Sequence, residues 1–290
     1  MADLTEEQVK KILQGVSIPP QPQIMVDLQM EQFMPDCNVD SIAKLISQDI
    51  GLAGSVLKTV NSPLYGLKNK ITSINQAVSL LGVNSVINLV NGLSIRGELS
   101  DDQIVSMGKF WDTSMEVAMA AAAIAKQIGF SSPDEAYTLG LFHNCGIPLL
   151  MMRFDNYPEV LKEAYSTEKK RIIDVENEQI KTNHAVVGYY VAKSWNLPMY
   201  LSQAIHDHHN TLKVLEDDNA DPRRKTLLTI LKMAEHICGN FRTLGGQEQD
   251  YEWDSIVEAV LLYVGLSHYD YESIEQQIKE MGLGAGDYYC

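Results

Sequence analysis

Residues 117–125 have the sequence VAMAAAAIA, the longest uncharged apolar run in the chain. A membrane span needs about 18 or more such residues, so this run is too short to cross a bilayer. Its alanines instead predict a buried helix that packs closely on its neighbours through small residues. Elsewhere, apolar residues recur at intervals of three and four, and sustained alternation is absent. That spacing is typical of amphipathic helices, so we predict an all-α fold.

Helix boundaries follow from the same pattern together with capping residues. The segment SINQAVSLLG (residues 73–82) predicts a helix that begins at a serine cap and ends at Gly82. In the second half of the chain, helices are predicted around residues 133–143, 156–165, 184–194, 198–209, 223–240, 252–263 and 271–281. The polar runs 216–222 and 244–254 are predicted to be solvated loops.

The composition of the sequence changes near residue 100. Residues 97–103, GELSDDQ, are polar and rich in capping residues, and a long helical pattern follows them. We therefore predict an N-terminal helical subdomain over residues 1–100 and a second helical subdomain over residues 101–290.

Charge and cysteine content limit the possible partners. The net charge is −15, of which −2 falls in residues 1–100 and −13 in the remainder. Such acidity argues against broad binding to nucleic acid or to an anionic membrane. The four cysteines include no C-x-x-C pair, and the N-terminus is polar rather than basic and then apolar. These features predict a cytoplasmic protein with reduced thiols and no signal peptide.

The pair His143–Asn144, in the run LGLFHNCGIPLL (residues 139–150), points to a chemical site. A histidine followed by an aspartate would be typical of half of a metal site. Asn144 offers one neutral oxygen and no charge, whereas a hydrolytic centre needs anionic ligands and a position for bound water. The pair therefore indicates a hydrolase-like centre that lacks a part. The adjacent Cys145 suggests either a nucleophile or a small buried residue, and we favour the second.

Four of the seven histidines are predicted at helix ends, where imidazoles from several helices of a bundle can converge. They are His143, His184, His208 and His209. Each alone is better explained as a capping or partly buried histidine than as a ligand. As a set they favour one shared pocket.

Seven segments of the chain are informative as an ordered set. They are IPPQPQIMVDL, LISQDIGLAGSVLKTVNSPLYG, ITSINQAVSLLGVNSVINLV, KFWDTSMEVAMAAAAIAK, AYTLGLFHNCGIPLL, HAVVGYYVAKSWNLP and AIHDHH. In this order they resemble the HDOD domain, a bacterial output domain related to the HD phosphohydrolase superfamily, and the resemblance covers about residues 17–210. It implies that the second subdomain is HD-like and ends in a C-terminal helical extension, within which LLTILKMAEHICG resembles the helix that supplies the last acidic ligand.

The resemblance also implies a set of pocket residues. The superfamily's metal ligands fall on Thr113, His143, Asn144, His184, His208, His209 and Glu235. Three positions depart from the pattern: Thr113 replaces a histidine, Asn144 an aspartate and Glu235 an aspartate. Two divalent ions roughly 3.5–4 Å apart need bridging oxygens, and only Glu235 is anionic in this set. We therefore expect no catalytic residues and no two-metal catalysis.

Our leading hypothesis is that the protein is a non-catalytic signalling module that binds a protein partner or a small ligand. The rival hypotheses are a metal-dependent phosphohydrolase acting on a nucleotide or phosphoester with an altered ligand set, and a nucleotide or cyclic-dinucleotide binder without turnover. We expect no cofactor and favour a hydrogen-bonded polar cluster that includes Asn144. The alternative is one divalent transition-metal ion held by His143, His184 and His208 or His209, with Glu235 as a further candidate ligand.

Overall fold

In the computed structural model of the chain, the described residues are 6–68, 70–94 and 108–284. Every regular element within these ranges is a helix, which confirms the predicted all-α class. None of the described helices is both long enough and apolar enough to cross a bilayer.

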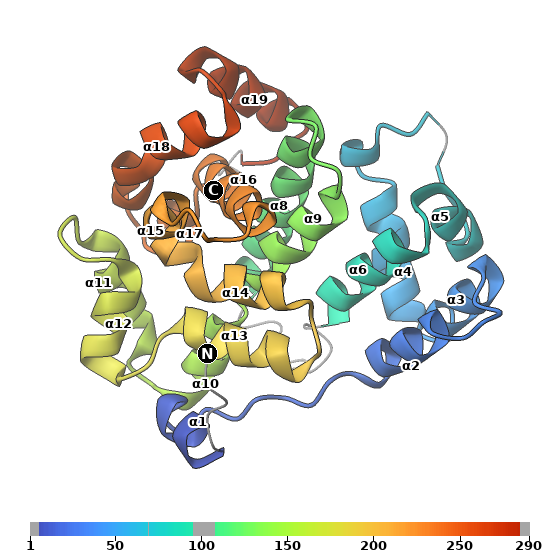
Figure 1. Ribbon diagram of the computed structural model, residues 1–290, viewed down its shortest axis with the longest axis horizontal. Helices are drawn as coiled ribbons and strands as arrows, with labels where there is room; N and C mark the ends of the chain where they lie inside the picture. The colour runs from blue at the N-terminus through green and yellow to red at the C-terminus, as the bar shows by residue number, and fades with distance from the viewer. Residues whose placement is uncertain (1–5, 69, 95–107, 285–290) are drawn as a thin grey trace.

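Residues 23–94 form a group of short helices that pack against one another (Figure 1). They are α2 (Gln23–Gln32), α3 (Val39–Ile46), α4 (Ile50–Val60), the 3₁₀ turn η1 (Pro63–Tyr65), α5 (Ile74–Leu81) and α6 (Val83–Ser94). The predicted caps of α5 are present: the Ser73 side chain accepts from the Gln76 N–H, and Gly82 follows with a φ of 85°. Helix α1 (Glu6–Ile12) lies apart from this group, near α10, and an extended segment joins it to α2.

The remaining helices form the larger part of the molecule (Figure 1). They are α8 (Gly108–Gln127), α9 (Pro133–Phe142), α10 (Gly146–Arg153), α11 (Tyr157–Ser166), α12 (Ile172–Ile180), α13 (His184–Ser194), α14 (Met199–Asp207), η3 (His208–Asn210), α15 (Thr211–Glu216), α16 (Pro222–Cys238), α17 (Asn240–Thr243), α18 (Tyr251–Val264) and α19 (His268–Glu280).

Helix α8 lies at the centre of this part and packs on both α9 and α16. The predicted small-residue packing is confirmed, because the alanines of the run 117–125 are buried. Gly140 of α9 shows how close the approach is: a Cβ added there would lie 2.7 Å from the Ala118 Cα. Only glycine allows the two helices this separation, and α9 in turn carries His143 at its end.

Helix α6 joins the first group to the second through α9. The Asn88 side chain donates to Asp134 Oδ2 at 2.5 Å, and the Thr138 hydroxyl lies 3.2 Å from the Asn88 carbonyl oxygen. The predicted subdomain boundary near residue 100 lies outside the described residues, so the division into 1–100 and 101–290 stays a prediction.

The predicted helices of the second half are present, and the structure adds α10, α12, α15 and α17 to them. The loop predicted over 244–254 is too long, because α18 already begins at Tyr251. Asp250 caps that helix by accepting from the Trp253 N–H at 3.0 Å. Trp253 is buried, so the last part of this polar run belongs to the core rather than to solvent.

Candidate functional site

The four histidines lie at helix ends, as the sequence predicts. His143 is the C-cap residue of α9, His184 is the first residue of α13, and His208 and His209 form the turn η3 after α14. A close approach between α10 and α13 fixes the position of His184. A Cβ on Gly146 would lie only 2.2 Å from the His184 carbonyl oxygen, so glycine is required at that position.

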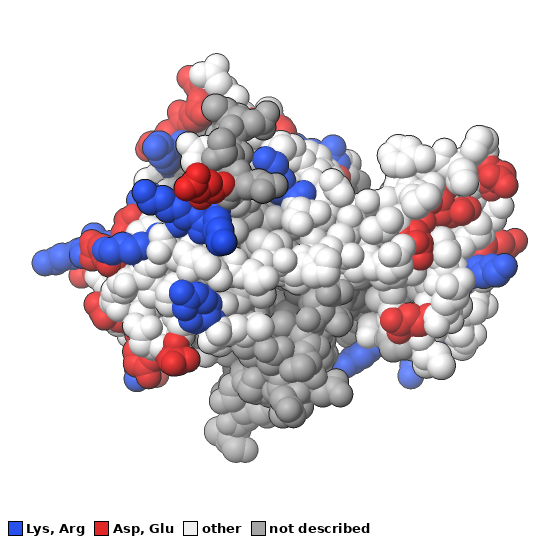
Figure 2. Space-filling view, turned by 90° about the horizontal axis from the view of Figure 1, so that it is seen from below, with Lys and Arg blue, Asp and Glu red and all other residues white. Residues whose placement is uncertain are grey.

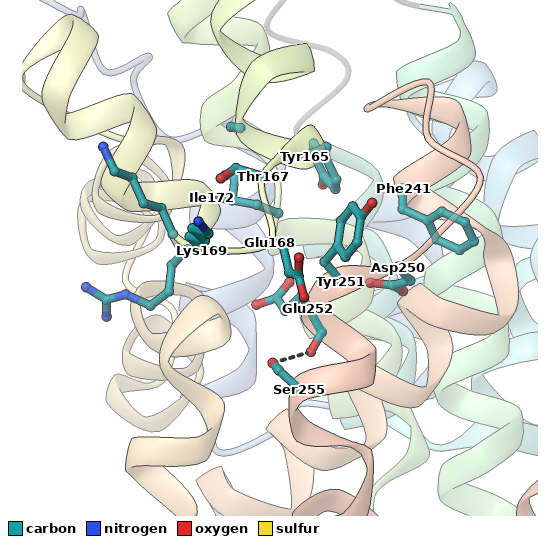
Figure 3. A pocket seen from close by; sticks show the side chains of 13 residues that line it. Tyr165, Thr167, Glu168, Lys169, Ile172, Phe241, Asp250, Tyr251, Glu252 and Ser255 are labelled. Carbon is teal, nitrogen blue, oxygen red and sulfur yellow. Dashed lines mark hydrogen bonds between the residues drawn. The ribbon is translucent and has the colours of Figure 1, made fainter.

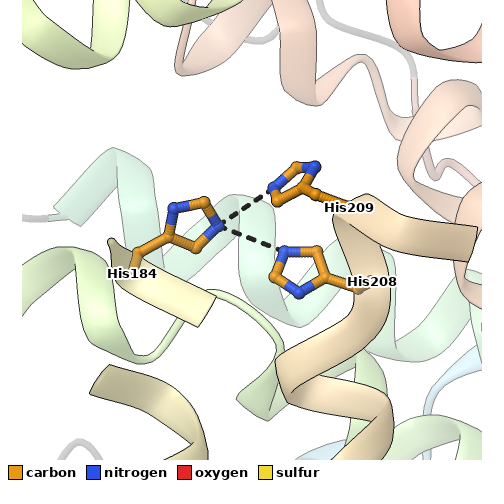
Figure 4. Close-up of side chains that lie close together, drawn as sticks. All are labelled: His184, His208 and His209. Atoms are coloured by element: carbon orange, nitrogen blue, oxygen red, sulfur yellow. Dashed lines mark hydrogen bonds between the residues drawn. The ribbon is translucent and has the colours of Figure 1, made fainter. Parts of the chain in front are cut away.

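His184, His208 and His209 form what we call the three-histidine cluster (Figure 4). The Nε2 atom of His184 lies 3.1 Å from His208 Nε2 and 3.0 Å from His209 Nε2. One ligand nitrogen from each ring lies within 4.8 Å of the other two. All three residues are buried.

The outward-facing ring nitrogens indicate where the protons are. His208 Nδ1 lies 2.7 Å from the Ile205 carbonyl oxygen, which can only accept, so Nδ1 must carry the proton. His184 Nδ1 faces the Glu176 carboxylate at 2.8 Å, and His209 Nδ1 faces the Glu252 carboxylate at 2.8 Å. In neutral rings the lone pairs are then all on Nε2, and these atoms point at one another. A proton or a metal ion between these atoms would satisfy their lone pairs.

The three-histidine cluster fits a single transition-metal ion. A tetrahedral ion with metal–nitrogen distances of ~2.0–2.1 Å holds its ligand nitrogens roughly 3.3 Å apart, close to the two separations measured from His184 Nε2. Metal-bound histidines usually donate their other N–H to a carboxylate or a carbonyl oxygen, as all three do. Burial lowers the pKa of His208 well below its usual value, and the neighbouring His209 and Lys232 lower it further. A neutral imidazole is the form that binds a metal.

A second group of ionisable residues, buried or half-buried, lies beside the first. Lys232 Nζ lies 2.9 Å from Glu235 Oε2 and 3.0 Å from Glu252 Oε2, and we call these three residues the lysine–carboxylate cluster. Only 3% of the Lys232 side chain is exposed. Burial alone would lower the pKa of Lys232, but the two carboxylates outweigh it and raise that pKa. Burial likewise opposes ionisation of Glu235, yet Lys232 and His143 hold its pKa well below the usual range.

His143 belongs to this second group rather than to the three-histidine cluster. Its Nδ1 donates to the Gly140 carbonyl oxygen at 2.6 Å, and its Nε2 lies 3.3 Å from Glu235 Oε1. The Asn240 amide nitrogen lies 3.4 Å from the same Nε2. The ring of His143 meets that of His208 at 88° with centroids 5.5 Å apart, so the two groups touch.

The other two predicted pocket residues, Thr113 and Asn144, are buried. Thr113 lies in α8 and is 7% exposed, and Asn144 follows His143 and is 1% exposed. Asn144 Oδ1 has no hydrogen-bond partner among the described residues, so the expected polar cluster does not engage this oxygen. Cys145 is a small buried residue. Burial raises the pKa of its thiol to about 12, which disfavours a thiolate nucleophile.

Four residues of the site are absent from the sequence prediction: Glu176, Lys232, Asn240 and Glu252. Glu176 is fully buried in α12 and accepts from the Tyr157 hydroxyl as well as from His184. A Glu three residues after Lys232 is one available signal, because it allows an i,i+3 ion pair on one face of α16. No comparable signal marks Glu176 or Glu252.

A pocket of about 170 Å³ leads from the surface to Glu252. Figure 3 shows Tyr165 and Ile172 of α11 and α12 on one side and Tyr251 and Glu252 of α18 on the other. A smaller cavity of about 20 Å³, enough for roughly one water molecule, shares Tyr165 and Glu252 and extends to the lysine–carboxylate cluster. The Tyr165 hydroxyl is buried and has no hydrogen-bond partner among the described residues. The pocket therefore gives small molecules a route toward the site.

The sequence model of the HDOD domain matches residues 18–211, about two thirds of the chain. The chain belongs to the HDOD family. This confirms the resemblance over about residues 17–210.

A curated relative, an uncharacterized protein from Treponema pallidum (strain Nichols), is 29% identical over 199 residues. The alignment covers 67% of this chain and 38% of the relative, so the chain spans less than two fifths of that protein's length.

Solved structures show the same fold. An HDOD domain protein of unknown function from Geobacter sulfurreducens has a TM-score of 0.68 and 24% identity, covering 94% of this chain and 93% of that chain. A candidate phosphohydrolase from Shewanella amazonensis SB2B has a TM-score of 0.65 and 23% identity, covering 93% and 94%. A candidate signal transduction protein from Marinobacter aquaeolei VT8 has a TM-score of 0.64 and 19% identity, covering 93% and 58%. At these identities the likeness concerns the fold alone.

Proposed function

We propose that this chain is a non-catalytic regulatory module of the bacterial cytoplasm. Its three-histidine cluster holds one divalent transition-metal ion, and its output is the binding of a small ligand or a protein partner. The observation that carries the proposal is the convergence of three Nε2 lone pairs whose Nδ1 atoms all face acceptors. The family membership and the signal-transduction naming of a relative with this fold are consistent with it.

Non-catalysis follows from the charges around the site. The two clusters and their direct partners include three carboxylates and one ammonium. The carboxylates are Glu176, Glu235 and Glu252, and the ammonium is that of Lys232. With the carboxylates ionised and the histidines neutral, the net charge is −2, which one divalent ion balances. Thr113 and Asn144 add no charge, so a second ion lacks the anionic bridge that two-metal hydrolysis needs.

The pocket suggests how a ligand would be sensed. Glu252 lines the pocket and also holds His209 Nδ1. A molecule that contacts Glu252 would therefore change the orientation and basicity of one metal-binding imidazole. Typical ligand sites occupy ~300–1,000 Å³, so the pocket of about 170 Å³ favours a compact ligand.

A metal-dependent phosphohydrolase is the second candidate. It is favoured by the three-histidine cluster itself and by the naming of a relative with this fold. A nucleotide or cyclic-dinucleotide binder without turnover is favoured by Lys169 and Arg171, which line the pocket and could pair with phosphate. The size of the pocket is the argument against a dinucleotide.

The surface charge supports small ligands or proteins as partners, rather than nucleic acid or an anionic membrane. Figure 2 shows Lys and Arg side chains gathered on the left of the face it draws. The right-hand lobe, which contains α2–α6, is mostly uncharged, with scattered acidic side chains and a few basic ones. Nucleic-acid binding relies on many Lys and Arg contacts to phosphate, which a protein of net charge −15 does not favour.

Metal analysis combined with a phosphoester panel tests the proposal. We expect about one transition-metal ion per chain, and hydrolysis of nucleotides and cyclic dinucleotides no faster than by His143→Ala. Asn144→Asp should raise metal affinity because it returns an anionic ligand, yet give little turnover. The double variant Asn144→Asp/Thr113→His tests whether the loss of these two ligands alone accounts for the missing turnover. Metal-dependent hydrolysis by the wild-type protein that His143→Ala abolishes would establish the second candidate instead.

A further inference from the structure

The lysine–carboxylate cluster contains a buried cation that belongs to the protein itself. Lys232 lies on α16, Glu235 follows one turn later, and Glu252 comes from the first turn of α18. The Lys232 ammonium contacts one oxygen of each carboxylate, at 2.9 and 3.0 Å. A buried ammonium is costly unless it is paired, and here it is paired twice.

The groups around Lys232 are those that would otherwise bind a metal ion. Glu235 and Glu252 bring two carboxylates to the ammonium, and His143 Nε2 lies 3.3 Å from the other oxygen of Glu235. Carboxylate oxygens suit Mg²⁺ and Mn²⁺, and imidazole suits most transition metals. The small cavity lined by Lys232, Glu235 and Glu252 reaches this place from the pocket side.

We propose that the Lys232 ammonium occupies the place of a second metal ion and limits the site to a single exchangeable ion. This deepens the proposed function, and it rests on that function in taking the three-histidine cluster as the place of the single ion. A fixed ammonium neutralises the carboxylates as a cation would, but it has no open coordination position and cannot activate water. Its charge also repels a second divalent ion.

Removal of the ammonium should therefore create a second metal site. Lys232→Met keeps an unbranched apolar stem and leaves Glu235 and Glu252 unbalanced. We expect equilibrium dialysis against Mn²⁺ to give one bound ion per wild-type chain and two per Lys232→Met chain. Lys225→Met is the matched control, because Lys225 is buried on the same helix but donates to the Leu215 carbonyl oxygen instead. The control should bind one ion.

A charge-balanced variant separates the effect from damage to the fold. Lys232→Met/Glu252→Gln removes one carboxylate together with the ammonium, and it should bind one ion. If Lys232→Met is unfolded without metal, refolding on addition of Mn²⁺, followed by circular dichroism, supports the proposal. A chain that stays unfolded at millimolar Mn²⁺ contradicts it.

The outcomes distinguish this inference from the proposed function. One ion in both the wild type and Lys232→Met would overturn the inference and leave the proposed single-ion site intact. No ion in the wild type and one in Lys232→Met would support the inference and remove the metal from the proposed function. No ion in either protein would overturn both.

Discussion

The two clusters lie side by side, yet the charged groups are arranged in opposite ways in them. In the three-histidine cluster the atoms that face inward are imidazole nitrogens, and two carboxylates face the far ring nitrogens of His184 and His209. In the lysine–carboxylate cluster the carboxylates face inward and an ammonium stands between them. The first cluster offers imidazole nitrogens to an added cation, whereas the second already contains the Lys232 ammonium.

Glu176→Ala should have the largest effect on the three-histidine cluster, both on its stability and on its metal affinity. Glu176 is fully buried and accepts from both His184 and Tyr157, so Glu176→Ala leaves two buried donors without an acceptor. Removal of one partner from a buried pair costs about 3–5 kcal/mol, and urea unfolding should show a loss of this size. Metal affinity should fall about 10–100-fold, because His184 loses the carboxylate that orients it.

Glu178→Ala is the matched control on the same helix. Glu178 pairs with Lys170 at the surface, where such a pair contributes at most about 1 kcal/mol. Equal losses of stability in the two variants would show that Glu176 is not a special support of the three-histidine cluster.

The positions of the histidines could be predicted because helix ends carry local signals. Asn183 caps α13 by accepting from the Val186 N–H at 2.9 Å, so His184 falls at the first helical position. Glu176 gives no such signal. It occupies a core position of α12 among buried apolar residues, and a charged residue there breaks the apolar spacing by which helices are recognised. The helix and the residue that supports His184 were therefore missed together.

Lys232 and Glu252 were missed for a related reason. Lysine and glutamate are rarely buried unless paired, and pairing between α16 and α18 is a tertiary contact that the sequence does not display. Glu252 lies in a polar run that the sequence pattern assigns to a solvated loop, although it belongs to the first turn of α18 beside the buried Trp253. The site residues at helix ends could thus be predicted from the sequence, whereas the charged residues at core positions could not.

The two clusters should also lose stability in different pH ranges. Burial lowers the pKa of His208 and His209 in the folded state, so below the unfolded value of ~6.5 the unfolded chain binds more protons. In metal-free protein, stability should therefore fall by about 1–2 kcal/mol from pH 6.5 to 5.5. The pKa values of Glu235 and Glu252 are lowered, so their contribution should persist until the pH falls below roughly 4.3.

Urea unfolding with a chelator present, measured across this pH range, separates the two effects. His208→Asn/His209→Asn should flatten the slope between pH 6.5 and 5.5 and leave the loss below pH 4.3. A slope that persists in this variant would assign the pH dependence to groups outside the three-histidine cluster.

Asn240 gives the smallest expected effect and tests whether the clusters act independently. Its amide nitrogen lies 3.4 Å from His143 Nε2 and 3.5 Å from Glu235 Oε1, so both contacts are long and weak. Asn240→Ala should cost about 1 kcal/mol in urea unfolding, the net contribution of a typical hydrogen bond. Because Asn240 has no recorded contact with His184, His208 or His209 among the described residues, transition-metal affinity should stay within about threefold of wild type. A tenfold loss of metal affinity would show that the lysine–carboxylate side also orients the ion, and the two clusters would then have to be treated as one site.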